Sequence, residues 1–103
     1  MQRFVSEKVT IGVDTTLADA EELPIGSFAG GAFVPGSGIT SIAFYGALEK
    51  GGTFYEIKSS ANAAVTRTVT ASDAYALPDE CFGFAALKFV GDADGTLQIC
   101  LKS

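Results

Sequence analysis

The chain has 103 residues, of which 48% are hydrophobic and 18% are charged, and its formal net charge is −5. This length predicts one domain with a single modest core. The seven Lys and Arg residues are scattered singly, and together with the acidic balance this disfavours nucleic acid and anionic membranes as partners. The high apolar fraction indicates that a partner covers part of the surface.

No secretory signal peptide or membrane span is expected. The amino-terminal Met-Gln-Arg-Phe leads directly into a strand-like segment, and no apolar run approaches the roughly 20 residues of a membrane span. We therefore expect the chain to be made and folded in a cytoplasm, where Cys81 and Cys100 stay free, structural thiols. Their spacing matches no zinc motif and the chain has no histidine, so we predict no metal and no cofactor.

The first 24 residues are predicted to hold one strand and one connection. The strand covers residues 3–11, and its apolar face consists of Val5, Val9 and Ile11. Residues 12–24 form an acidic connection that ends at Pro24. The segment 1–24 is also a candidate extended arm that adds a strand to a neighbouring subunit, and its contact residues would be Arg3, Phe4 and Val5.

Glycine punctuates the next segment. Residues 25–34 are predicted to form a Gly-rich strand or a bulged pair of strands. Three glycines indicate a bend or a close approach of two backbones there: Gly26, Gly30 and Gly31. The Pro-Gly-Ser-Gly sequence at 35–38 predicts a turn.

The clearest element is the ribbon at 39–58, ITSIAFYGALEKGGTFYEIK. Its two alternating runs, 39–46 and 53–58, flank the turn-like Glu-Lys-Gly-Gly and predict a hairpin. One face of the ribbon is predicted to contain Thr40, Ile42, Phe44, Tyr55 and Ile57. The other, solvent-directed face is predicted to contain Tyr45, Phe54, Glu56 and Lys58.

The remaining segments continue the β pattern. Strands are predicted at 64–70, 74–78, 84–90 and 96–102, with a turn or one helical turn at 79–83 and a hairpin turn at 91–95. The predicted core residues are Leu87, Phe89, Leu97, Ile99 and Leu101, and Cys100 points the other way. Arg67 falls on an apolar face, so we expect its stem to be buried while its head reaches water.

Seven or eight short strands, about ten residues apart, predict an all-β sandwich formed by residues 1–103 as a single domain. Jelly-roll and Greek-key topologies both fit this spacing.

The side chains assemble no catalytic site. Without histidine there is no triad and no Cys-His pair, and Glu80 disfavours the thiolate of Cys81. The acidic pairs are interpreted as solvated loops: Glu21-Glu22, Asp79-Glu80 and Asp92/Asp94. Asp92 to Gly95 lacks the remaining ligands of a calcium loop, although weak calcium binding there stays open. We predict no catalytic residue and no metal ligand, so the chain is not expected to be an enzyme.

Aromatic side chains are the better candidates for a contact site. Tyr45 and Phe54 are placed to pair across the ribbon, and Tyr55 adjoins them. These three residues could contact another protein. Alternatively, they could stack on sugars in a small carbohydrate-binding module, although the absence of Trp counts against that alternative.

The stretch from Ile39 to Ser103 resembles small head proteins of tailed phages and prophages. The matching positions are Ile39, Thr40, Ile42, Phe44, Gly51, Gly52, Thr53, Phe54, Val65, Val69, Leu77, Pro78, Phe82, Gly83, Leu87, Lys88 and Phe89. The amino-terminal third matches less well. The resemblance implies a jelly-roll sandwich without catalytic residues that decorates or cements a capsid. On this reading the partner is the major capsid protein, the chain is a homo-oligomer, with a trimer favoured, and its location is the capsid surface of the virion.

Overall fold

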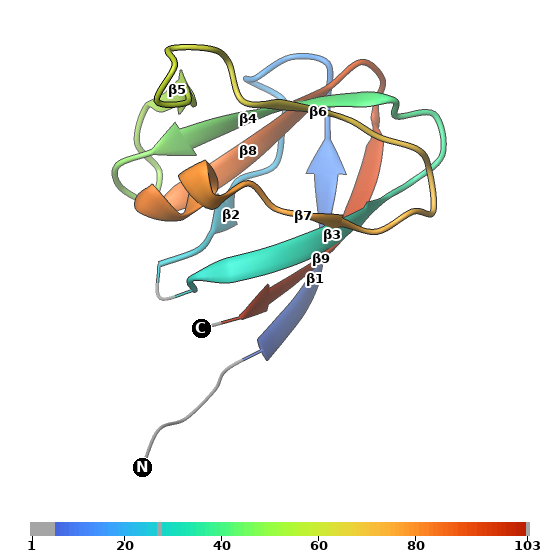
Figure 1. Cartoon of the computed structure of the whole chain (residues 1–103), viewed down its shortest axis with the longest axis horizontal. Coiled ribbons are helices and arrows are strands. Elements are labelled where there is room, and N and C mark those ends of the chain that lie inside the picture. Colours follow the sequence, from blue (N-terminus) through green and yellow to red (C-terminus); the bar gives the residue numbers. More distant parts are fainter. Residues whose placement is uncertain (1–5, 27, 103) are drawn as a thin grey trace.

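The computed structural model describes residues 6–26 and 28–102, and it shows two antiparallel sheets packed face to face (Figure 1). Sheet A has the strand order β1-β9-β3-β7. Its strands are β1 (Ser6–Val13), β9 (Gly95–Lys102), β3 (Gly30–Pro35) and β7 (Tyr75–Ala76). The candidate arm residues Arg3, Phe4 and Val5 lie outside the described residues.

Sheet B has the strand order β2-β8-β4-β5, and β6 also pairs with β4. Its strands are β2 (Leu23–Pro24), β8 (Ala86–Gly91), β4 (Ser41–Ala47), β5 (Phe54–Glu56) and β6 (Thr66–Thr68). The short strands β5 and β6 pair with different ends of β4, so together they form one interrupted edge strand. A single turn of 3₁₀ helix, η1 (Asp79–Gly83), precedes β8.

This order of strands is a jelly roll. Along the chain the strands pass back and forth between the two sheets, and the last strand, β9, lies between β1 and β3. The predicted all-β sandwich is confirmed, and the topology is the jelly-roll alternative. The described residues contain nine strands rather than seven or eight, because the segment before Ile25 contributes a second strand.

Aromatic side chains join the two sheets at the centre. The ring of Phe33, in sheet A, meets the ring of Phe44, in sheet B, edge-on at 6.2 Å between centroids. Phe44 in turn meets Phe89 of β8 at 5.7 Å, also edge-on. Phe33, Phe44 and Phe89 are at most 1% exposed, so these rings form the middle of the core. In the described residues no polar or charged side chain is fully buried.

The carboxy-terminal strands follow the prediction. The five predicted core residues are all buried: Leu87, Phe89, Leu97, Ile99 and Leu101. Cys100 lies on the opposite face of β9 and is half-buried. The expected single helical turn is η1. Arg67 is half-buried, and its guanidinium donates a hydrogen bond to the carbonyl of Ala76 at 3.3 Å, so it connects β6 to β7 across the sandwich.

Three predictions for the amino-terminal half are corrected. The first strand is β1, which continues to Val13 rather than ending at residue 11. The acidic connection contains β2, where Leu23 is buried and Pro24 occupies an exposed edge position that needs no N–H donor. The Gly-rich segment is one strand from Gly30, because the chain before it bends where the Phe28 N–H donates to the Ile25 carbonyl at 2.8 Å.

Candidate contact surface

The predicted contact residues lie on the β4–β5 hairpin but not on one face. Tyr45 of β4 and Phe54 of β5 point to the outer side of sheet B and are half-buried. Tyr55 points to the other side of β5 and is 57% exposed. The structure therefore brings Tyr45 and Phe54 together and separates Tyr55 from them.

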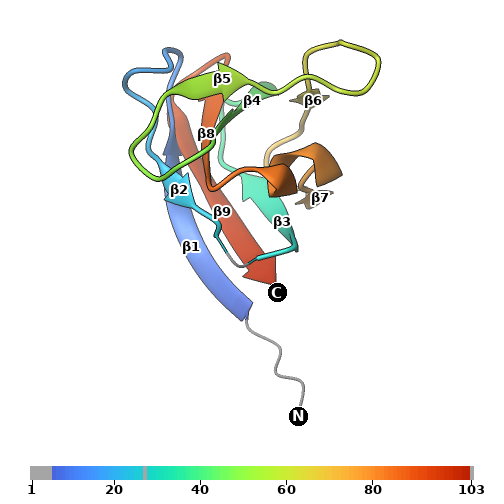
Figure 2. The same ribbon diagram turned by 90° about the vertical axis from the view of Figure 1, so that its left-hand side faces the viewer.

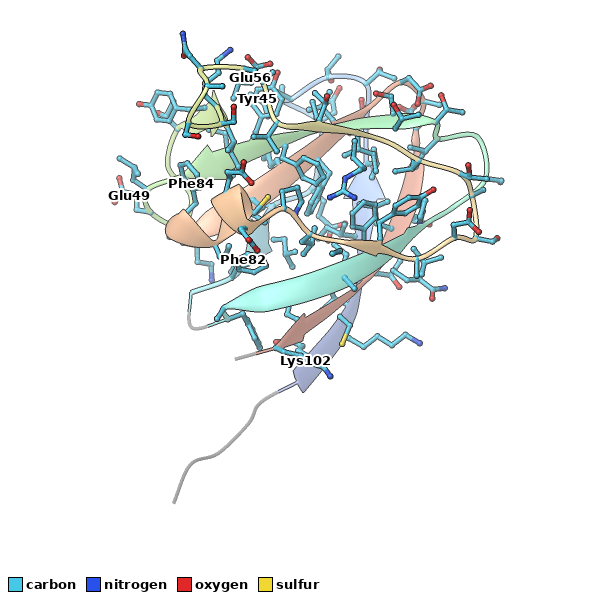
Figure 3. The ribbon with its side chains drawn as sticks, in the orientation of Figure 1. Tyr45, Glu49, Glu56, Phe82, Phe84 and Lys102 are labelled. Atoms are coloured by element: carbon cyan, nitrogen blue, oxygen red, sulfur yellow. The ribbon has the colours of Figure 1, made fainter. Side chains whose placement is uncertain are left out.

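Tyr45 and Phe54 do not stack on one another. The register places Tyr45 opposite Glu56, close to it in Figure 3, and places Phe54 opposite Ala47, so the two rings are diagonal neighbours. The ring of Phe54 instead carries the ammonium of Lys88, 4.9 Å from its centroid. Lys88 also donates to the carbonyl of Leu17 at 3.2 Å. One face of the Phe54 ring is thus occupied by a cation, which leaves less of it for a ligand.

Tyr55 differs from its predicted position. It was expected to share the core face with Ile57, which is buried, but Tyr55 is one of the exposed large hydrophobic residues. Its strand partner is Gly46, whose inner side is already filled by the ring of Phe84 (Figure 3): a Cβ at Gly46 would lie 2.4 Å from that ring. Tyr55 therefore has no place in the core and remains at the surface.

Sequence reasoning missed Leu48, which is 76% exposed. Leu48 follows β4 directly, at the start of the turn, and with Tyr55 it forms an exposed apolar pair on the same hairpin, which we call the hairpin tip. The tip is anchored, because the Gly51 N–H donates to the Glu22 carboxylate at 3.0 Å. The only signal in the sequence was an apolar residue directly before the polar turn Glu-Lys-Gly-Gly.

The acidic side chains tie the loops together. The Glu21 carboxylate accepts a hydrogen bond from the Gly12 N–H at 2.9 Å, and the Asp94 carboxylate accepts one from the Thr15 N–H at 3.3 Å. The bonds of Asp94 to Thr15 and of Glu22 to Gly51 join connections that are 79 and 29 residues apart, while the bond of Glu21 ties its connection to β1. The loop interpretation holds for Glu21-Glu22 and Asp92/Asp94, although Glu22 is half-buried. Asp79 and Glu80 are exposed but lie in η1 rather than in a loop. In the described part of the chain, no group of three or more His, Cys, Asp or Glu side chains is arranged to hold a metal ion.

Asp92 makes the most extensive of these loop contacts. Its carboxylate accepts hydrogen bonds from the Thr40 N–H at 2.9 Å, from the Ser41 N–H at 3.2 Å and from the Thr40 hydroxyl. These bonds, the one from the Thr40 hydroxyl first, hold the pKa of Asp92 below its ordinary value of 3.8. They fix the turn between β8 and β9 against the start of β4.

We expect Asp92→Ala to destabilise the protein at neutral pH and to have less effect in acid. Because the folded pKa is lowered, the ionised carboxylate contributes stability above the ordinary pKa of 3.8, and this contribution is lost as the pH falls through the folded value. Urea denaturation of both proteins at pH 7 and at about pH 2.5 measures the difference. Asp73→Ala, which removes an exposed carboxylate from the loop before β7, is the control. An equal loss for Asp92→Ala at both pH values would contradict the assignment.

The thiol of Cys81 is free and fully buried in η1. Burial, followed by the negative charge of Glu80, raises its pKa to about 12. The thiol is therefore protonated at neutral pH, and the expectation that Cys81 is a free structural cysteine is confirmed. The described residues include no helix that is long and apolar enough to cross a membrane.

The fold is similar to that of the SPBc2 prophage-derived protein YomS, whose crystal structure superposes with a TM-score of 0.62. The match covers 100% of this chain and 97% of the other chain, at 16% sequence identity. At this identity the similarity shows a shared fold. No protein-family model and no curated protein sequence matches the chain.

Proposed function

We propose that this chain is a non-enzymatic structural protein of a phage or prophage particle. It decorates or cements the capsid by binding the major capsid protein, after synthesis in the host cytoplasm, and acts as a homo-oligomer for which a trimer is favoured. The observation that carries the proposal is the jelly roll shared, over nearly the whole length of both chains, with a prophage-derived protein. The resemblance of residues 39–103 to phage head proteins points in the same direction and rests on different evidence.

The hairpin tip supports binding to a protein surface. Leu48 and Tyr55 are the exposed large hydrophobic residues in the described part of the chain, and both belong to the β4–β5 hairpin. The bond from Gly51 to Glu22 anchors the loop between them, so little conformational entropy is lost when the tip docks. Many copies on one shell would gain avidity from contacts that are individually weak.

The chemistry of the side chains agrees with a binding role. Cys81 is buried and protonated, and the carboxylates of Glu21, Glu22 and Asp92 are engaged with backbone N–H groups. A sugar-binding platform finds less support, because Phe54 is covered on one face by Lys88. A stacking site usually needs an open aromatic face, and among the three predicted residues only Tyr55 is more than half exposed.

We expect the protein to pellet with expanded capsids of the phage or prophage that encodes it, and to do so saturably. The double variant Leu48→Lys and Tyr55→Lys should bind at least tenfold more weakly, because burying each apolar side chain contributes about 1.5–3 kcal/mol and tenfold corresponds to about 1.4 kcal/mol. Sedimentation with a dilution series of each protein measures this.

The matched control is Ala74→Lys, which adds a charge to an exposed position in the loop between β6 and β7, away from the hairpin tip in Figure 1. It should bind as the unmodified chain does. If the unmodified protein stays in the supernatant, the proposed function is wrong. If the two tip substitutions leave binding unchanged, the capsid contacts a different face.

A further inference from the structure

A groove is lined by β1, at the edge of sheet A, and by residues 21–24, 26 and 28, which include β2 at the edge of sheet B. Figure 2 shows β1 and β2 on the same side of the molecule. It has a volume of about 470 Å³. Its floor is apolar and consists of Val9, Ile11, Leu23 and Phe28. Ile11 and Leu23 belong to the core, while Val9 and Phe28 are half-buried against it, so the groove is an opening onto the side of the sandwich.

One wall of the groove is an unpaired strand edge. In sheet A, the carbonyls of Thr96 and Lys102 accept hydrogen bonds from the N–H groups of Gly36 and Ala29, on the side of β3. The even-numbered residues of β9 therefore direct their backbone N–H and C=O groups to β3, and the odd-numbered residues direct theirs to β1. The odd-numbered residues of β1 lie opposite the odd-numbered residues of β9 and exchange hydrogen bonds with them. The even-numbered residues of β1 therefore direct their backbone N–H and C=O groups away from β9.

The bond from the Gly12 N–H to the Glu21 carboxylate confirms this direction, because Gly12 is an even-numbered residue whose donor leaves the sheet. The same alternation places the backbone N–H and C=O groups of Lys8 and Thr10 on the open edge of β1. An edge of this kind is a template for pairing with another extended chain.

The rim of the groove is acidic. Glu7, Glu21 and Glu22 line it, and among the described residues that line it there is no Lys or Arg. Glu7 and Glu21 are exposed, and Glu22 is half-buried. A ligand that combines apolar side chains for the floor with cationic side chains for the rim would complement both surfaces.

We propose that this groove binds an extended segment of another polypeptide as an additional strand beside β1, with both apolar and basic side chains on the face of the segment that points into the groove. The backbone of the segment pairs with Lys8 and Thr10, its apolar side chains lie on Val9 and Phe28, and its Lys or Arg side chains reach the rim. Because Glu21 already occupies the Gly12 N–H, the added strand ends there and spans only about three to five residues. This proposal does not depend on capsid decoration.

The test uses the acetylated, amidated hexapeptide Val-Thr-Lys-Thr-Val-Thr, whose Val and Lys share one face of the strand, titrated into the isotope-labelled full-length protein. We expect saturable amide shifts that are largest at Lys8 and Thr10, and binding that weakens with salt because the rim contributes charge. The matched peptide Val-Thr-Glu-Thr-Val-Thr should bind at least tenfold more weakly. A Val-Thr-Lys-Thr-Val-Thr peptide that is N-methylated on the residues facing β1 should lose binding, since it cannot donate to the edge.

Two protein variants separate the rim from the edge. Glu7→Lys reverses a rim charge on an exposed side chain and should weaken binding at least tenfold, whereas Asp73→Lys, which makes the same change on a distant exposed loop, should not. Thr10→Pro removes an edge N–H that does not pair with β9 and should abolish binding in a protein that remains folded.

The proposal is overturned if shifts fail to saturate at millimolar peptide, or if they centre on another strand. It is also overturned if the Lys8 and Thr10 amides respond to protein concentration alone, which would make a second copy of this chain the occupant. Capsid sedimentation of Glu7→Lys is independent of these outcomes, so failure here leaves the proposed function standing.

Discussion

Phe44→Ala is expected to lower the free energy of unfolding by about 3–5 kcal/mol, which is the usual cost of removing a buried phenylalanine ring. Phe44 is 0% exposed and contacts Phe33 at 6.2 Å and Phe89 at 5.7 Å, so its loss leaves a cavity between the two sheets. For a domain of this size that corresponds to a fall in melting temperature of more than about 12 °C. Thermal and urea denaturation measure both quantities.

Tyr55→Ala is the control for this prediction. It also removes an aromatic ring, but one that is 57% exposed, and it should cost less than about 1 kcal/mol. If Phe44→Ala does not fold, Phe44→Leu should still fold and show an intermediate loss. Equal effects of Phe44→Ala and Tyr55→Ala would mean that the aromatic contacts between the sheets do not dominate the core.

Gly31→Ala is expected to destabilise the protein by about 2–3 kcal/mol, at the upper end of the usual cost of overpacking. A Cβ at Gly31 would lie 2.6 Å from the carbonyl oxygen of Cys100 and 3.0 Å from the side chain of Leu77. The nearest atom is backbone in the neighbouring strand, so β3 and β9 must separate. Urea denaturation of the variant measures the loss.

The adjacent glycine provides a matched comparison. At Gly30 nothing lies within 4 Å of the position of a Cβ, and the φ angle is not in the left-handed region. Gly30→Ala should therefore be neutral or stabilise the protein by about 0.4–1 kcal/mol, because alanine restricts the unfolded chain. If both variants lose the same stability, the close approach at Gly31 is not the cause.

The sequence predicted the strands whose two faces differ most in polarity. In β9, Leu97, Ile99 and Leu101 alternate with Thr96, Gln98 and Lys102. A shift of the strand register by one residue would expose the whole apolar face, so the pattern determines which face is buried. The prediction of a bend or a close backbone approach held as a bend at Gly26 and as a close approach at Gly31. It did not hold as a close approach at Gly30, because the approach depends on which residue of the neighbouring strand lies opposite.

The amino-terminal half was harder to predict because its strand positions depend on distant partners. β2 has two residues, and it is a strand only because Leu23 and Pro24 pair with Leu87 and Ala86 of β8. No local pattern distinguishes such a segment from a connection. The bend closed by the Phe28 N–H and the Ile25 carbonyl is likewise determined by where β2 of sheet B ends and β3 of sheet A begins.

The contact surface was predicted in location but not in composition. The hairpin was the correct element, but Tyr55 alternates with Phe54 and was therefore assigned inward with Ile57. Its place in the core is taken by Phe84, which lies almost 30 residues further along the chain and packs on Gly46. A contact of this kind depends on tertiary structure, and Leu48 was overlooked because a single exposed leucine has no periodicity.

The position of β9 between β1 and β3 constrains how the chain acquires its structure during translation. The register of sheet A pairs Ser6 with Lys102, so its central strand is synthesised after the strands on both sides of it. Until then β1 and β3 have no common partner, and the apolar faces of both remain accessible to other chains. Formation of sheet A is thus dominated by long-range pairing, which is slow compared with local helix formation and carries a risk of intermolecular pairing when many copies are made together.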